Sequence, residues 1–212
     1  ANINNVPVGD RTVSGLLADD GSISVATSGD LTVNAAVTSS GAGNDVTLTT
    51  TGSGNIAVNA LIQSDDAVIL DSAGAITDGD GLNNVDAVSL AATALNGIEL
   101  DTEVGTLSAI NSGTGAVDIS NGGGALTTVT TATTNNGTVT LANTGGALTV
   151  TTATAQGADN DLTITNSGGA LTVGTATTTD GSVLLSNTGG NLSVTTVEAV
   201  GAGNDVLLET IT

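Results

Sequence analysis

The six residues GAGNDV occur twice in the chain, at 41–46 and at 201–206. Gly-x-Gly-Asn-Asp is close to the nonapeptide that binds calcium in parallel β-rolls, where tandem turns share the ions. The related turns of this chain, which include QGADNDL at 156–162, do not follow one another in tandem. Two readings therefore stay open: a glycine-rich turn that uses positive φ angles, or a metal site. The candidate metal ligands are Asn44, Asp45, Asp66, Asp161, Asn204 and Asp205.

Aspartates also recur one to three residues before one class of predicted strand, the class whose first members begin at Ile23 and Val46. They are Asp20, Asp45, Asp66, Asp86, Asp161, Asp180 and Asp205. If those strands stack, neighbouring carboxylates lie about 4.8 Å apart and repel one another. A hard divalent cation with oxygen ligands would relieve that repulsion. The sequence therefore predicts weak calcium binding along one acidic edge; no cofactor is required, and calcium is the one candidate.

A second acidic group lies in GIELDTEVG, where Glu99, Asp101 and Glu103 alternate with apolar residues. On a strand these three carboxylates share one face, and residues two apart are roughly 6.6 Å apart at Cα. That spacing suits the carboxylate pair of an inverting glycosidase. The chain has no Lys or His to act as a base and no aromatic ring to hold a sugar. A solvated strand face is the first interpretation, a local cation site the second and an enzyme the third.

The composition excludes several function classes. Among 212 residues, 21 carboxylates face a single cation, Arg11, and the formal net charge is −20. Binding to nucleic acid needs clustered Lys and Arg, so no nucleic-acid partner is expected. No apolar run is long enough to cross a bilayer, so no membrane insertion is expected. Without His or Cys there is neither a serine triad nor an ordinary zinc site.

A repeat of about 22 residues organises the chain. Four segments align by eye: NGGGALTTVTTATT, NTGGALTVTTATA, NSGGALTVGTATT and NTGGNLSVTTVEA, with Leu126, Leu148, Leu171 and Leu192 in register. The short alternating strands that the aspartates precede begin at Ile23, Val46, Val68, Val88, Val117, Val139, Leu162, Val183 and Val206. These starts recur at steps of roughly 22 residues, except for one irregular 29-residue coil between Val88 and Val117.

These patterns predict an all-β fold. Strict two-residue alternation indicates strands, and a repeat of this length between turn clusters is typical of a β-solenoid. We expect about nine coils in one domain over residues 1–212, with residues 21–212 in regular repeats and residues 1–20 in an irregular coil or junction segment. A β-sandwich, which also has evenly spaced short strands, is the competing interpretation.

Four asparagines lie five residues before the leucines of their repeats: Asn121, Asn143, Asn166 and Asn187. In a solenoid they would lie above one another, and stacked amides hydrogen-bond along the axis. The same residues also suit the turns that Asn and Gly favour. The two interpretations are compatible, and neither implies catalysis.

The ends of the chain suggest continuation. If a second copy followed, Ile23 of that copy would follow Val206 at the same interval at which Val117 follows Val88 inside the chain. An uncapped solenoid exposes unpaired backbone groups and an apolar cross-section. We therefore expect the chain to associate with itself head to tail, either as a homopolymer or as a tandem repeat. The residues expected at the two contacting ends are Ile3, Val6, Val206, Leu208 and Ile211.

The stretches NDVTLTTTGSGNIAVNALIQSDDAVILDSAGAITDGDG and GTLSAINSGTGAVDISNGG resemble the β-solenoid repeats of filamentous-haemagglutinin-like and autotransporter-type bacterial surface proteins. The resemblance covers residues 21–212 and rests on a loose pattern of Gly, Asn, Val, Leu and Thr. It implies a right-handed parallel β-helix at the bacterial cell surface or outside the cell, as part of a stalk, adhesin or fibre.

The function expected from these observations is structural and non-enzymatic: an extracellular β-solenoid that builds a fibre or stalk by continuing its own coils. The alternative is an adhesin module that binds a protein of a host or neighbouring cell. The third interpretation is a polysaccharide-acting β-helix enzyme.

Overall fold

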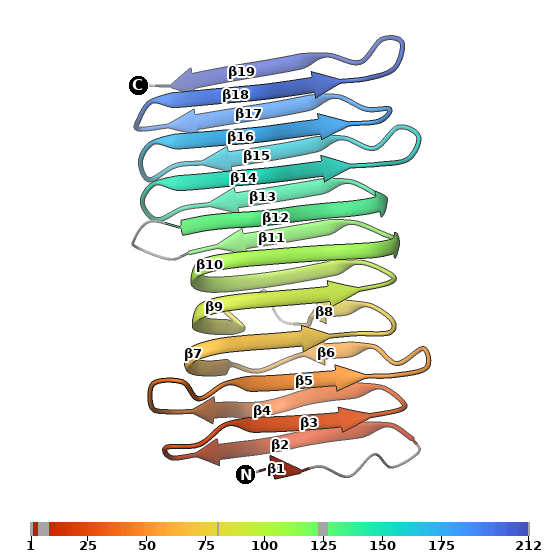
Figure 1. The fold of residues 1–212 in the computed structure, drawn as a ribbon, viewed down its shortest axis with the longest axis vertical. Helices are drawn as coiled ribbons and strands as arrows, with labels where there is room; N and C mark the ends of the chain where they lie inside the picture. The colour runs from red at the N-terminus through yellow and green to blue at the C-terminus, as the bar shows by residue number, and fades with distance from the viewer. Residues whose placement is uncertain (1, 4–8, 80, 123–126, 212) are drawn as a thin grey trace.

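The computed structural model describes residues 2–3, 9–79, 81–122 and 127–211, and it is a single stack of β coils (Figure 1). All pairings between its strands are parallel, and the described residues form no helix, so none that could cross a membrane. The strands are β1 (Asn2–Ile3), β2 (Arg11–Ala18), β3 (Ile23–Thr27), β4 (Leu31–Ser39), β5 (Val46–Thr50), β6 (Ile56–Val58), β7 (Ile62–Asp71), β8 (Ile76–Asp78), β9 (Val85–Ala94), β10 (Ile98–Thr114), β11 (Val117–Asn121), β12 (Thr127–Asn136), β13 (Val139–Asn143), β14 (Leu148–Ala155), β15 (Leu162–Asn166), β16 (Leu171–Thr178), β17 (Val183–Thr188), β18 (Leu192–Ala199) and β19 (Val206–Ile211).

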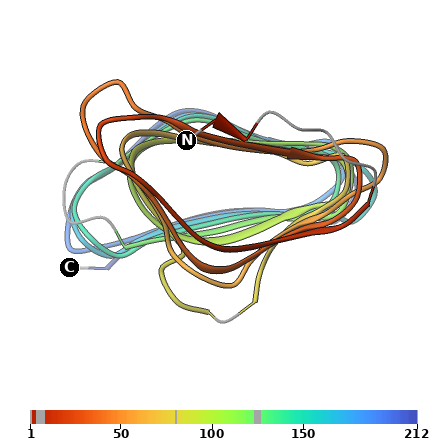
Figure 2. The same cartoon turned by 90° about the horizontal axis from the view of Figure 1, so that it is seen from below.

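Each coil crosses the solenoid twice, so two long sheets run along the axis. We call "sheet A" the stack that contains β3, β5, β12, β14, β16 and β18, together with the second halves of β7, β9 and β10. "Sheet B" contains β2, β4, β6, β8, β11, β13, β15, β17 and β19, together with the first part of β10. Viewed along the axis, the coils share one elongated outline, and they diverge most in the turns at its edges (Figure 2).

Two-residue alternation places the apolar residues inside. In β3, β5, β13 and β15 every second residue is buried, as expected for strands with one face toward the core. One inward column of sheet B is almost fully buried along its length: Leu31, Ile56, Ile76, Ile98, Val117, Val139, Leu162 and Val183. The prediction of an all-β parallel solenoid, with about nine coils of a repeat typical of such folds, is confirmed; its right-handedness stays a prediction.

The prediction of one long irregular coil between Val88 and Val117 is wrong. The aligned positions in sheet A are Ile23, Val46, Val68, Leu90, Leu107, Val129, Val150, Val173 and Val194. After Leu31 those in sheet B are Ile56, Ile76, Ile98, Val117, Val139, Leu162, Val183 and Val206. The irregular coil is in fact short, because the steps from Leu90 to Leu107 and from Ile98 to Val117 are the shortest in their columns. Val88 is 60% exposed and belongs to neither column.

The reason for the error lies in this short coil. The class of strand that begins at Ile23 and Val46 lies in sheet A before it, and the same class, beginning at Val117, lies in sheet B after it. The strand β10 runs through 17 residues without a turn, so the next glycine turn of the familiar pattern falls at the other edge of the solenoid. The interval from Val88 to Val117 therefore covers about one and a half coils. As a result, Leu148, Leu171 and Leu192 stack in sheet A, whereas Ile98 belongs to sheet B. Leu126, the first leucine of the series, lies outside the described residues.

Candidate functional site

The first GAGNDV turn, at 41–46, is closed by its asparagine. The Asn44 Nδ2 donates to the Ser40 carbonyl oxygen at 2.9 Å and lies 3.5 Å from Asp20 Oδ1 of the preceding coil. Gly41 and Gly43 have φ angles of 95° and 79°, a region that L side chains rarely adopt. The motif therefore has a structural reason for its two glycines and for its asparagine.

The second copy and its relative repeat this arrangement. The Asn204 Nδ2 donates to the Val200 carbonyl at 2.6 Å and to Asp180 Oδ1 of the preceding coil at 3.0 Å. In QGADNDL the Asn160 Nδ2 donates to the Gln156 carbonyl at 2.7 Å. In all three turns, therefore, the asparagine amide donates to the backbone carbonyl four residues earlier. This shared bond supports the turn interpretation of GAGNDV.

The structure divides the six predicted metal ligands between two edges. Asn44 and Asp45 precede β5 of sheet A, and Asp66 lies within β7, just before its sheet A half. Asp161, Asn204 and Asp205 precede strands of sheet B. The strands β5 and β19, which follow the two GAGNDV turns, begin at opposite edges of the solenoid (Figure 1). The prediction of a single acidic edge is therefore wrong. The reason is again that the repeat pattern moves from one sheet to the other at β10.

Several of these carboxylates have backbone partners. Asp45 Oδ1 accepts the N–H of Ala67 at 3.2 Å, and Asp161 Oδ1 accepts the N–H of Ser182 at 2.8 Å. Each bond joins one coil to the next and disperses the carboxylate charge without an ion. The described residues contain no group of three His, Cys, Asp or Glu side chains that could hold a metal.

The calcium prediction is tested by thermal melting. We expect calcium to raise the melting temperature no more than magnesium does at equal ionic strength, because both ions only screen the repulsion among 21 carboxylates. Circular dichroism in calcium, magnesium and chelator would measure this. A rise of several degrees that only calcium produces would show that the chain has a specific calcium site.

The asparagine column lies inside the solenoid between sheets A and B. Asn121, Asn143, Asn166 and Asn187 are all buried and are paired in register along sheet B. Each Nδ2 donates to the Oδ1 of the next asparagine, at 3.0, 2.7 and 2.9 Å along the series. Beneath the column, the Thr102 hydroxyl donates to Asn121 Oδ1 at 2.9 Å. We call these four residues the asparagine ladder.

Sequence reasoning missed a second column of buried polar residues at the other edge. Its members are Thr27, Thr50, Ser72, Asn111, Thr134 and Thr178. Their side chains bond to turn carbonyls, as when Thr50 Oγ1 donates to the Gly54 carbonyl at 2.6 Å and Asn111 Nδ2 to the Gly115 carbonyl at 2.7 Å. The available signal was a Thr, Ser or Asn near the end of a strand, a few positions before a glycine.

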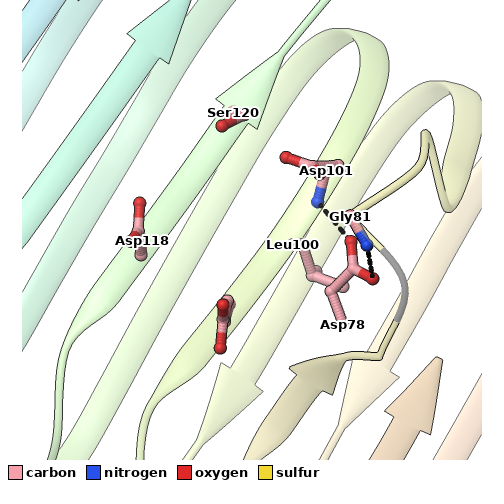
Figure 3. Close-up of a pocket in the computed structure, with 7 residues that line it drawn as sticks. Asp78, Gly81, Leu100, Asp101, Asp118 and Ser120 are labelled. Atoms are coloured by element: carbon pink, nitrogen blue, oxygen red, sulfur yellow. Dashed lines mark hydrogen bonds between the residues drawn. The ribbon is translucent and has the colours of Figure 1, made fainter. Parts of the chain in front are cut away.

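The predicted acidic strand face forms a shallow hollow on the outside of sheet B (Figure 3). The lining residues are Asp78, Gly81, Glu99, Leu100, Asp101, Asp118 and Ser120. Asp78 is fixed there by the N–H groups of Gly81 and Asp101, each 3.2 Å from one of its carboxylate oxygens. Glu103, the third member of the predicted trio, lines a neighbouring hollow with Asp101 and Asn83.

Sequence reasoning missed Asp78 and Asp118 as members of this hollow. Asp118 is the direct strand partner of Glu99, so their Cα atoms are about 4.8 Å apart. Burial, and after it the negative charge of Asp101, raises the pKa of Asp118 above its ordinary value of 3.8. The arrangement attracts cations. A catalytic pair was only the third interpretation of Glu99 and Asp101; that the chain has no catalytic residue stays a prediction.

Replacing Asp118 by asparagine should stabilise the protein at neutral pH. Because its pKa is higher in the folded chain than in the unfolded chain, this carboxyl favours folding at low pH, and that contribution is lost as the pH rises above 3.8. We expect Asp118→Asn to raise the melting temperature by up to about 2 °C at pH 7 and not at about pH 3. Glu198→Gln, the same charge change at an exposed site, is the control; an equal gain there would contradict the local explanation.

The coil with β18 and β19 leaves an apolar edge open. Val206, Leu208 and Ile211 are 43%, 47% and 56% exposed, whereas Val183 and Leu185, the partners of Val206 and Leu208 one coil below, are buried. At the other end of the stack of coils, Ile3 belongs to β1 and pairs with Val25 of β3. Val6, also predicted at that end, lies outside the described residues.

Comparison with known proteins adds no relative. No protein-family model matches the chain, and no match was found among curated proteins or solved structures. The β-solenoid fold is compatible with filamentous-haemagglutinin-like and autotransporter-type proteins, but membership of either family has no support beyond that fold and the repeat pattern.

Proposed function

We propose that this chain is a structural, non-enzymatic β-solenoid that builds a fibre or stalk outside the bacterial cell by stacking further coils on its own end. The observation that carries the proposal is the open edge of β19. Its inward positions continue columns that are fully buried one coil below. A parallel strand added there would bury these side chains and pair the free backbone groups of the edge.

The charge distribution supports growth along the axis. A formal charge of −20 on a chain with one cation keeps the sides of neighbouring solenoids apart. The buried asparagine ladder and the apolar columns make each coil a template for the next. An open contact between unlike ends, repeated without closing into a ring, produces a filament.

The acidic hollow favours a second candidate function. Asp78, Glu99, Asp101 and Asp118 gather on one outer face of sheet B, and such a face attracts a basic segment of another protein. An adhesin module that binds a cationic protein of a host or neighbouring cell would use this surface. Binding of such a protein that is lost in Asp118→Asn, without any polymerisation of the chain, would favour this candidate.

Sedimentation velocity over a concentration series tests the main proposal. We expect large assemblies above a threshold concentration, and faster assembly after addition of preformed seeds. Leu208→Asp, which places a charge in the inward column of β19, should abolish assembly; Leu207→Asp, equally exposed on the outward side of the same strand, should not. A monomer at every concentration, with and without seeds, would refute the proposal.

A further inference from the structure

A ladder of side-chain acceptors precedes the strands of sheet B. At the position just before each strand, Asp10 Oδ1 accepts the N–H of Asp30 at 3.1 Å, and Asp30 Oδ1 accepts the N–H of Asn55 at 2.7 Å. Asn55 Oδ1 then accepts the N–H of Ala75 at 2.8 Å. In each case a side chain of one coil bonds to the backbone of the equivalent residue in the next coil.

The same ladder returns in the last coils. Asp161 Oδ1 accepts the N–H of Ser182 at 2.8 Å, and Ser182 Oγ accepts the N–H of Asp205 at 3.2 Å. Asp205 is the residue before β19, so its carboxylate occupies the last position of the ladder, at the open edge. Asp10 occupies the first position, just before β2.

We infer that a second copy of this chain docks on β19 through its β2, in the register that places Asp10 of that copy on Asp205. This inference rests on the proposed function and specifies its contact. In this register the Asp205 carboxylate accepts the N–H of Asp10 of the second copy, as Asp10 itself accepts the N–H of Asp30. Both strands belong to sheet B and run in the same direction across the solenoid, so the parallel pairing continues.

The register also assigns a place to the chain's only cationic side chain. Arg11 pairs with Leu31 in the inward column of sheet B, so Arg11 of the second copy lies above Val206. Its Nε is buried and has no hydrogen-bond partner in the single chain.

Cysteine cross-linking tests the register, since the chain contains no cysteine of its own. The inferred pairing puts Leu207 opposite Thr12 of the second copy, both on the outward side. Their Cα atoms would be about 4.8 Å apart, within the range that a disulfide spans. Thr12→Cys/Leu207→Cys should form a ladder of disulfide-linked oligomers, whose linked peptides mass spectrometry identifies. Thr12→Cys/Glu209→Cys, two residues out of register, should form at least tenfold less.

The outcomes separate this inference from the proposed function. Fibres whose linked peptides do not join residue 12 to residue 207, or equal cross-linking of the shifted pair, would overturn the register and leave the fibre function standing. The absence of any assembly by either variant and by the unmodified chain would refute the proposed function itself.

Asp205→Ala provides a second test without cysteines. Loss of the last acceptor should raise the threshold concentration for assembly about tenfold, the effect of one charge-assisted hydrogen bond. Glu198→Ala removes the same charge from the exposed side of β18 and should leave the threshold unchanged or lower it. Equal thresholds for the two variants would contradict the role of Asp205.

Discussion

Replacing Asn166, an interior member of the asparagine ladder, by alanine should strongly destabilise the protein. Its amide donates to Asn187 Oδ1 and to the Gly169 carbonyl, and its Oδ1 accepts from Asn143. The variant leaves these partners buried with fewer bonds, at about 1–3 kcal/mol for each unsatisfied group. We therefore expect a loss of about 4 kcal/mol in the free energy of unfolding.

Urea denaturation followed by circular dichroism would measure this loss. Asn191→Ala is the control, because Asn191 lies at an exposed position in the equivalent turn of the next coil and should change stability by less than about 0.5 kcal/mol. Asn166→Asp adds a diagnostic: a buried carboxylate opposes folding at neutral pH, and protonation at low pH restores a donor. Equal losses for Asn166→Ala and Asn191→Ala would show that the ladder contributes nothing beyond local turn chemistry.

Replacing Gly181 by alanine should also destabilise the protein strongly, for a steric reason. Its coil stacks on the turn below so closely that a Cβ on Gly181 would overlap the carbonyl group of Asn160. Coils separated by about 4.8 Å cannot move apart locally without breaking the strand pairs on both sides of the turn. We expect a loss of about 3 kcal/mol, as for overpacking in a rigid interior.

The chain contains its own control for this substitution. Gly21 lies in the tetrapeptide Asp-Gly-Ser-Ile, which corresponds to Asp-Gly-Ser-Val around Gly181. A Cβ on Gly21 would have no atom within 4 Å, and its φ is not positive. Gly21→Ala should therefore be neutral or stabilise by up to about 1 kcal/mol. Urea midpoints that fall equally in both variants would indicate a backbone requirement of the motif rather than a clash between coils.

The sequence was sufficient for the fold class and insufficient for the register. Alternating Val, Leu and Ile with a repeat of about 22 residues can bury its apolar face only by stacking, so the solenoid could be predicted. Sheets A and B, however, carry the same short alternation. Nothing local distinguishes Ile98, which begins a strand of sheet B, from Leu107, which begins a segment of sheet A.

The candidate sites show the same limit. The spacing of the four asparagines was enough to predict that they stack, because their repeats all lie on one side of the short coil. Asp45 and Asp205 have identical neighbours in the sequence but lie at opposite edges, so their grouping failed. The approach of Asp118 to Glu99 depends on the register between β10 and β11, which the sequence does not reveal.

Fibre diffraction from aligned assemblies of the purified chain tests the central claim most directly. If copies stack end on end, the solenoid axis is the fibre axis, and the spacing between coils gives a strong meridional reflection near about 4.8 Å. We expect that reflection from fibres one solenoid wide in electron micrographs. Fibres whose reflection at about 4.8 Å lies off the meridian would show side-by-side association and contradict the claim, as would discrete rods of roughly 43 Å, the length of nine stacked coils.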